Sequence, residues 1–323
     1  MIAQTPDRID QNTAEEASAS PDSQKDSVSE SPDIETKPFF SILDRPQGYV
    51  ASSINFLTRN MDEFFSNENA LYESTGSYIR LTADTVLSEG GEVGYIGDAR
   101  ARVALPNTQK KLRLVVESDP AESRDDLDRP LEENPLDAAE EKSYFAGLET
   151  LFGEFENWRF RPGIGLKLSS GVDHFWRIRA SRTFALGESW QSYFTNTLYW
   201  FNSTGYRDDF SLEFDHKTDS DLLFRARSFA SRTEENDYWD LSQVFSVTQT
   251  LSQNRALVYL AGVYGVNEPN THATDYLIQI RYRQRIHSDY LFLGLIPQIL
   301  YPEESDFETQ YSLILRLELV FKG

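Results

Sequence analysis

Basic side chains recur at alternate positions of extended segments along this 323-residue chain. Fourteen bases share one face of these segments: Arg80, Arg100, Arg102, Arg113, Arg159, Arg161, Lys167, Arg177, Arg179, Arg225, Arg227, Arg281, Arg283 and Arg316. Seven acids share the same face: Asp84, Asp98, Glu117, Glu149, Glu213, Asp215 and Glu318. A guanidinium group stays protonated and binds carboxylate, phosphate or sulfate through two parallel hydrogen bonds. The face therefore has a net charge near +7 and a chemistry suited to anions.

Histidine beside aspartate or serine is the other pattern that could do chemistry. The candidates are Asp173-His174, Asp215-His216, His272 with Asp275, and His287-Ser288. A hydrolase needs such groups within hydrogen-bond reach of one another. Adjacent residues of a strand point to opposite faces, so neither Asp-His dipeptide forms a pair on one face. We therefore expect surface or turn histidines and no enzyme.

The composition excludes several classes of site. The chain has no cysteine, which removes disulfides, thiolate metal ligands and cysteine nucleophiles, and it has four histidines. It contains no phosphate-loop or zinc-ligand pattern, and the acidic stretch 119–142 lacks the spacing of a calcium loop. We expect no cofactor and no metal. A pI near 4.6 also argues against binding to nucleic acid, which needs a basic face.

The acidic charge is concentrated in two segments. Residues 1–41 carry about −6 and residues 117–142 carry −8 of the total of −21. The first segment has few apolar residues and cannot bury enough area to offset its chain entropy, so we predict a disordered acidic tail over 1–45. The second contains three prolines and predicts one long solvated loop. The acidity therefore belongs mostly to appendages of a less charged body.

The elements that would position the basic face are strands. About 14 segments separated by turn residues follow one another, at 77–88, 92–105, 110–118, 143–153, 158–169, 174–185, 189–202, 208–217, 221–231, 238–249, 254–265, 274–286, 289–300 and 308–321. Many alternate between apolar and polar residues. A strand that crosses a bilayer needs roughly 9–11 residues, whereas strands of soluble domains average about 5–6. This pattern favours an all-β fold, a transmembrane up-and-down antiparallel β-barrel of about 14 strands, with 12 to 16 possible.

The connections and the tryptophans agree with a membrane barrel. Tight turns alternate with longer links, which would place short turns on one rim and long loops on the other. The five tryptophans, Trp158, Trp176, Trp190, Trp200 and Trp239, each lie within a few residues of a predicted strand end. Aromatic girdles of membrane barrels lie at that level, although chance placement at strand ends is the alternative.

The segment 311–321 resembles the terminal strand of bacterial outer-membrane β-barrels, with alternating apolar residues that lead to the aromatic Phe321. The departure is Lys322-Gly323 after that aromatic. The stretches 161–165, 286–293 and 301–304 are similar to those of proteobacterial outer-membrane barrel proteins that have no assigned activity. The resemblance covers about 77–323. It implies a porin-like fold, lipid and lipopolysaccharide as surroundings, and recognition of the terminal strand by the barrel-assembly machinery.

Three functions follow for such a barrel. The first is an outer-membrane channel for small anionic solutes, because charged rings set the sign preference of a pore. Alternatively, the bases and acids form a structural ladder in a plugged barrel that docks a partner. A membrane hydrolase is the least favoured. The chain as given shows no signal peptide, since 1–4 lack basic and apolar regions, so localisation in the outer membrane rests on the barrel.

An amphipathic segment precedes the first predicted strand. We predict a short helix within 46–70, because apolar residues recur there at helical spacing: Val50, Ile54, Leu57, Met61, Phe64 and Phe65. This helix could plug or cap the lumen, lie on the membrane interface, bind a partner or be a small packed helix without a regulatory role. The predicted organisation is thus a tail over 1–45, a helix over 46–70 and a barrel over 77–323.

Overall fold

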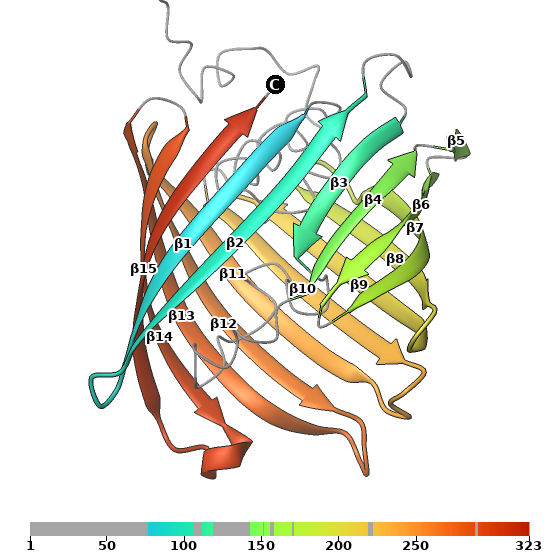
Figure 1. The fold of residues 1–323 in the computed structure, drawn as a ribbon. Helices are drawn as coiled ribbons and strands as arrows, with labels where there is room; N and C mark the ends of the chain where they lie inside the picture. The colour runs from blue at the N-terminus through green and yellow to red at the C-terminus, as the bar shows by residue number, and fades with distance from the viewer. Residues whose placement is uncertain are drawn as a thin grey trace, which may run out of the picture. The chain divides into compact units, whose positions relative to one another are not determined.

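The computed structural model describes residues 77–105, 112–118, 143–150, 152–155, 158–169, 171–218, 222–287 and 290–322 (Figure 1). The tail predicted over 1–45, the helix predicted over 46–70 and the acidic stretch 119–142 lie outside the described residues. Within the described ranges, no helix is long and apolar enough to cross a membrane.

Strands make up nearly all of the described chain. They are β1 (Tyr78–Ser88), β2 (Val93–Ala104), β3 (Leu112–Ser118), β4 (Tyr144–Thr150), β5 (Gly153–Phe155), β6 (Trp158–Leu168), β7 (Val172–Ala185), β8 (Trp190–Phe201), β9 (Gly205–Lys217), β10 (Leu222–Thr233), β11 (Asp240–Ser252), β12 (Arg255–Val266), β13 (His272–His287), β14 (Leu291–Pro302) and β15 (Gln310–Lys322). A single turn of 3-10 helix, Glu303–Ser305, lies between β14 and β15. These bounds lie within a few residues of the segments predicted from alternation.

The strands form one closed antiparallel sheet. Each strand from β6 to β15 pairs with its neighbour in sequence, and β1 pairs with β15 (Figure 1). The ring closes through β4, which pairs with both β3 and β6. The short β5 also pairs with β6, at positions that follow those of β4, so β4 and β5 are two parts of one interrupted strand. The barrel therefore has 14 strands, and the predicted closed antiparallel β-barrel and its strand count are confirmed.

The interruption between β4 and β5 faces a proline. Glu149 of β4 lies opposite Gly163, and Gly153 of β5 lies opposite Phe160, so neither part of the strand pairs with Pro162. Proline has no N–H group to donate to a ladder, and a strand break is where it is tolerated. Pro297 is different, because it lies within the continuous strand β14. There the pairing with β13 passes from Gln298 directly to Leu295.

Glycines allow a close approach where the ring closes. Gly147 of β4 lies opposite Gly165 of β6. A Cβ atom built on Gly165 would lie 2.8 Å from the Cα of Gly147 and 2.9 Å from a ring carbon of Phe175. Next to it, Gly163 leaves the space that the side chain of Arg177 occupies. The stretch 161–165, noted in the sequence for its resemblance, therefore contains the glycines on which this junction depends.

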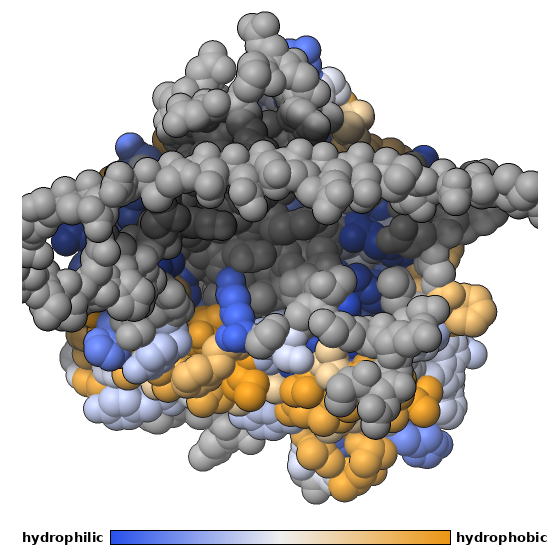
Figure 2. Space-filling view, turned by 90° about the horizontal axis from the view of Figure 1, so that it is seen from above, coloured by the Kyte–Doolittle hydropathy of each residue, from blue (hydrophilic) through white to orange (hydrophobic). Residues whose placement is uncertain are grey.

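The two faces of the sheet differ in chemistry. On β15, Leu315 and Leu317 are exposed on the outer face, whereas Ile314 and Glu318 are buried on the inner face. The same alternation exposes Ile278 and Ile280 of β13 and buries Leu277 and Gln279. Viewed along the barrel, orange hydrophobic residues gather on the outside of the wall and blue hydrophilic residues lie toward its inside (Figure 2). This outer surface is the apolar wall that a bilayer requires.

The two rims carry different connections. Tyr78 at the start of β1 lies opposite Lys322 at the end of β15, so both lie at one rim. The described links at that rim are short, at 186–189 and 253–254. The links at the opposite rim include 234–239, 267–271 and 303–309. The links 89–92 and 202–204 at the same rim are short. The described links therefore follow the predicted alternation in part, and we call these two ends the short-turn rim and the long-loop rim.

Replacing Gly165 with valine should impair barrel closure. The added side chain would collide with the backbone of β4 and with Phe175, and overpacking of this kind costs about 1–3 kcal/mol or more. We expect a loss of the heat-modifiable, folded band on a gel after refolding into detergent. The control is Gly171→Val, since a Cβ atom at Gly171 meets nothing within 4 Å. Equal folding of both variants would contradict this role of Gly165.

Candidate functional site

The inner face of the barrel carries every base that the sequence placed on one face. Residues directly opposite in antiparallel strands point to the same side of a sheet. The register places Arg80 opposite Arg100, Arg161 opposite Arg179, and Arg316 opposite Asp84. The remaining bases follow the same alternation, and so do all seven predicted acids. Nine of the fourteen bases are buried against the wall: Arg80, Arg100, Arg102, Arg113, Arg161, Arg177, Arg225, Arg227 and Arg283.

One network of ion pairs joins the first and last strands. Glu318 of β15 forms ion pairs with two arginines, Arg80 of β1 at 3.1 Å and Arg283 of β13 at 2.8 Å. Beside it, Arg316 of β15 binds both carboxylate oxygens of Asp84 of β1. The contacts of Arg80 with Glu318 and of Arg316 with Asp84 link residues more than 200 positions apart in the sequence. They hold the strands that close the barrel.

A second network lies across β3, β4 and β7. The guanidinium group of Arg177 donates to Glu117 at 2.6 Å and to Glu149 at 3.0 Å. All three side chains are buried, and Gly163 on the intervening strand β6 makes room for Arg177. One arginine therefore bridges two carboxylates across an intervening strand.

A third network lies on β9 and β10. Arg225 binds Asp215 at 2.7 Å and Glu213 at 3.2 Å. Nearby, Arg207 binds Asp209 at 2.8 Å, and Ser231 donates to Asp209 as well. Arg207 and Asp209 are additions to the predicted inner face. Arg207 was missed because β9 begins at Gly205, earlier than the sequence suggested, whereas Asp209 shares the alternation of Glu213 and could have been found.

Arg285 is a third inner-face residue that sequence reasoning missed. It follows Arg281 and Arg283 at the same alternate spacing on β13, so the alternation alone could have identified it. Its guanidinium carbon lies 5.7 Å from the ring centroid of Phe292, an inner-face residue of β14. Arg283 lies over the same ring at 3.6 Å.

Part of the inner wall carries little charge. The inner face of β12 consists of Ala256, Val258, Leu260, Gly262 and Tyr264. Beside it, buried apolar residues of β11, β13 and β14 form one cluster with Leu260 and Tyr264. A second apolar cluster joins β14 and β15 to β1 and β2: Val86, Ile96, Ile296 and Ile314. The bases are therefore distributed unevenly, with most of them on β1 to β3, β6 and β7.

The tryptophans lie in two groups near the rims. Trp158 and Trp190 are close to the short-turn rim, where Trp158 contacts Phe194 and Trp190 stacks on His216 with ring centroids 4.3 Å apart. Trp200 contacts His174 near the long-loop rim. The other two tryptophans at that rim are Trp176, directly opposite Trp200, and Trp239, which contacts Phe210. This arrangement is compatible with the predicted membrane girdle, which stays a prediction.

The histidines make local contacts that do not resemble a catalytic pair. His174 and His216 pack against tryptophans. Asp173 instead accepts hydrogen bonds from the backbone and hydroxyl of Ser203. His272 has its Nε2 atom 3.5 Å from Glu303. Among the described residues, no group of three or more histidine, aspartate or glutamate side chains is placed to hold a metal ion.

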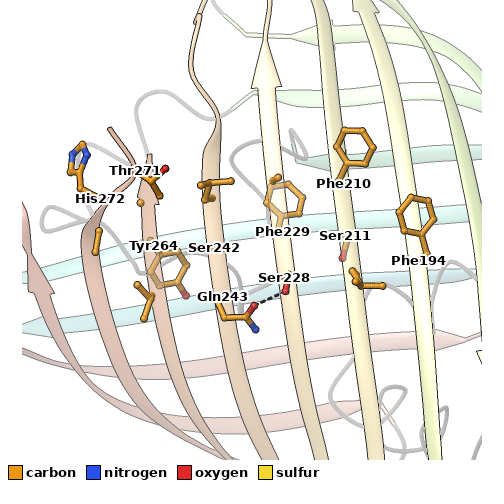
Figure 3. Close-up of a pocket in the computed structure, with 16 residues that line it drawn as sticks. Phe194, Phe210, Ser211, Ser228, Phe229, Ser242, Gln243, Tyr264, Thr271 and His272 are labelled. Atoms are coloured by element: carbon orange, nitrogen blue, oxygen red, sulfur yellow. Dashed lines mark hydrogen bonds between the residues drawn. The ribbon is translucent and has the colours of Figure 1, made fainter. Parts of the chain in front are cut away.

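An apolar groove of ≈ 520 Å³ lies on β8 to β13, outside the lumen. Phe194, Leu212, Ser228, Gln243 and Val263 lie opposite one another along successive strands, so they share one face. Val263 is 40% exposed, which identifies this face as the outer one. Figure 3 shows the hydrogen bond from the Ser228 hydroxyl to Gln243 within the groove. The groove is thus a feature of the outer wall and not a solute site.

The chain is similar to outer-membrane barrels of solved structure. One is a bacterial polysaccharide outer membrane secretin, 12% identical, which matches over 76% of this chain and 98% of its own with a TM-score of 0.43. Another is the KdgM porin in complex with disordered oligogalacturonate, 9% identical, over 76% and 99% of the two chains with a TM-score of 0.35. A third is a loop-deletion mutant of OmpT, an outer membrane protein of Vibrio cholerae, 9% identical, over 77% and 100% with a TM-score of 0.42.

No protein-family model matches the chain, and no curated protein matches it. The solved structures fall in the class that the sequence resembles. The function therefore has to be argued from the inner wall.

Replacing Glu318 with glutamine should destabilise the barrel. The substitution keeps the side-chain size but removes the charge that Arg80 and Arg283 share, and breaking a buried ion pair on one side costs about 3 kcal/mol or more. We expect a loss of that order in the free energy of unfolding, measured by tryptophan fluorescence in urea with detergent micelles. Glu188→Gln, in an exposed turn, should change it by less than about 0.5 kcal/mol. A loss of equal size in both variants would argue against the network.

Proposed function

We propose that this protein is a bacterial outer-membrane channel for the passive diffusion of small anionic solutes. The observation that supports the proposal is the excess of bases on the inner wall of a closed barrel: fourteen predicted bases share that face with seven predicted acids. A barrel of 14 strands is too wide for wall side chains alone to fill. Charge in such a lumen sets which ions enter.

The sign of the inner wall is opposite to that of the whole chain. The total charge is −21, and the segments 1–41 and 117–142 account for most of it. An anion that enters the barrel would interact with the guanidinium groups of the wall at close range. Interactions between charges that lie farther apart than about 8 Å are largely screened at physiological ionic strength. The local field of the wall, and not the total charge, therefore governs the preference.

The proposal includes the surroundings of the barrel. The apolar outer face and the two groups of tryptophans fit a bilayer with aromatic residues at both interfaces. Lipopolysaccharide would then contact the long-loop half of the wall. The barrel-assembly machinery would recognise β15, whose outer face alternates to Phe321.

A plugged barrel that docks a partner is the second candidate function. The observation that favours it is the apolar part of the inner wall, where Leu260, Tyr264 and Leu277 are buried in one cluster. Such a surface suits a packed apolar segment better than it suits a hydrated solute. In this case the intact chain would conduct poorly, and removal of residues 1–70 would open the pore.

Reversal of two inner-wall charges should reduce the anion preference. Arg159 and Lys167 lie on the inner face of β6, and the double variant R159E/K167E changes the luminal charge by four units without touching the buried ion pairs described above. We expect a reversal potential in a KCl gradient that reports anion preference for the original chain. In the variant the anion-to-cation permeability ratio should fall about three-fold or more.

The control makes the same change of charge outside the lumen. Arg232 is exposed at the long-loop rim and Arg255 is exposed at the start of β12, so R232E/R255E should leave the reversal potential unchanged. Cation preference of the original chain would contradict the proposal. Absence of conductance in the intact chain, with conductance after removal of 1–70, would favour the docking barrel instead.

A further inference from the structure

We propose that the inner wall holds a discrete binding site for a phosphate-like oxyanion, centred on Arg161 and built with Tyr193. This inference rests on the proposed function and names the solute class and the place where it binds. The ligand would be a tetrahedral dianion, either free phosphate or a phosphate ester. The site lies nearer the short-turn rim, since β6 starts at that rim with Trp158 and Arg161 is only three residues farther along the strand.

Five guanidinium groups gather around two carboxylates at this place. Arg161 lies opposite Arg179, and it interacts electrostatically with Arg102 and Glu149 as well. Arg113 lies opposite Glu149 and interacts with Arg102. The acids are already engaged, because Arg177 binds both Glu117 and Glu149. The cluster as a whole therefore keeps a large positive charge at short range, which is the field that a divalent anion requires.

Several donors of the cluster are buried and available. Arg161 is 4% exposed, and its Nε and Nη1 atoms have no hydrogen-bond partner among the described residues. The same holds, within those residues, for Nη1 of Arg113, which is 6% exposed. Leaving charged donors buried without acceptors costs free energy. An oxyanion bound at Arg161 would supply the acceptors.

A hydroxyl group completes the site. Tyr193 lies on the inner face of β8, one strand beyond β7, and is 5% exposed. Its hydroxyl also lacks a hydrogen-bond partner among the described residues. Tyr193 interacts electrostatically with Arg161, which places its phenol in the same cluster. Guanidinium forks together with hydroxyls match the several acceptor oxygens of phosphate better than a spherical chloride ion.

Arg225 and Arg316 belong to networks in which each arginine is held by a carboxylate. Arg225 uses its Nε and Nη2 atoms on Asp215, and Nη2 also pairs with Glu213. Arg316 likewise binds Asp84 with two nitrogen atoms. Those arginines are matched by neighbouring carboxylates, and their role is structural. The cluster at Arg161 is therefore the place on the wall where a transported anion would bind.

The test is block of the chloride current by inorganic phosphate in planar bilayers. Phosphate added on the short-turn side should reduce the current of the original chain, and the half-blocking concentration should rise about ten-fold in R161Q, because two charge-assisted hydrogen bonds are lost. Tyr193→Phe removes one hydroxyl and should raise it about three-fold without a change of charge. Arg255→Gln, outside the lumen, should leave it unchanged.

A second measurement does not depend on conductance. Phosphate should raise the temperature at which the detergent-folded band is lost on a gel, relative to sodium chloride of equal ionic strength, and this protection should be absent in R161Q. The Tyr193→Phe variant supplies the comparison if R161Q does not fold.

The outcomes separate the site from the channel. An anion-selective channel that phosphate neither blocks nor protects would overturn the site and leave the proposed function standing. Protection by phosphate that depends on Arg161, in a protein without anion selectivity, would support the site and overturn the channel. Equal block and equal protection in the original chain, R161Q and Tyr193→Phe would overturn the site.

Discussion

The structure depends on one constraint: a strand inside a bilayer finds no water for its backbone N–H and C=O groups. Every strand must therefore pair on both edges, and the sheet must close on itself. Closure is achieved where β1 meets β15 and where β4 meets β6. At β4 the strand is interrupted opposite Pro162, which could not have donated to a ladder there. The paired glycines Gly147 and Gly165 let the backbones approach closely beside the interruption.

Once the sheet closes, the alternation of apolar and polar residues along each strand gives the barrel two surfaces. The outer surface faces lipid and the inner surface faces the lumen. Outward residues such as Leu315 and Ile278 face the bilayer. Inward arginines lie beside one another on the wall, as Arg161 lies opposite Arg179. Like charges at this density need partners, and Glu318, Asp84 and Glu149 provide them at the points where neighbouring strands must be held together. Where acids are outnumbered, near Arg161, positive charge is left for a solute. In the proposed channel, stability and anion preference would thus come from the same set of side chains.

Much of this could be predicted from the sequence, because period-two alternation is a local property. The segment 308–321 predicted β15, and all fourteen bases were placed on one face before any register was known. Strand β12 was ambiguous, since Leu257 and Leu260 are equally apolar, and only pairing with its neighbours shows that Leu260 faces inward. The partners of each arginine could not be predicted at all. Arg316 binds Asp84 because the first and last strands meet, which depends on closure of the whole ring.

The central claim is that the two faces of these strands meet lipid and an aqueous lumen, and spin labelling along β15 tests it most directly. The chain has no cysteine, so a single labelled cysteine can be placed in turn at positions 312–317 in lipid vesicles. We predict that labels at 313, 315 and 317 are relaxed mainly by oxygen dissolved in the lipid, and labels at 312, 314 and 316 mainly by a water-soluble nickel chelate. Equal access of the chelate to all six positions would contradict the account.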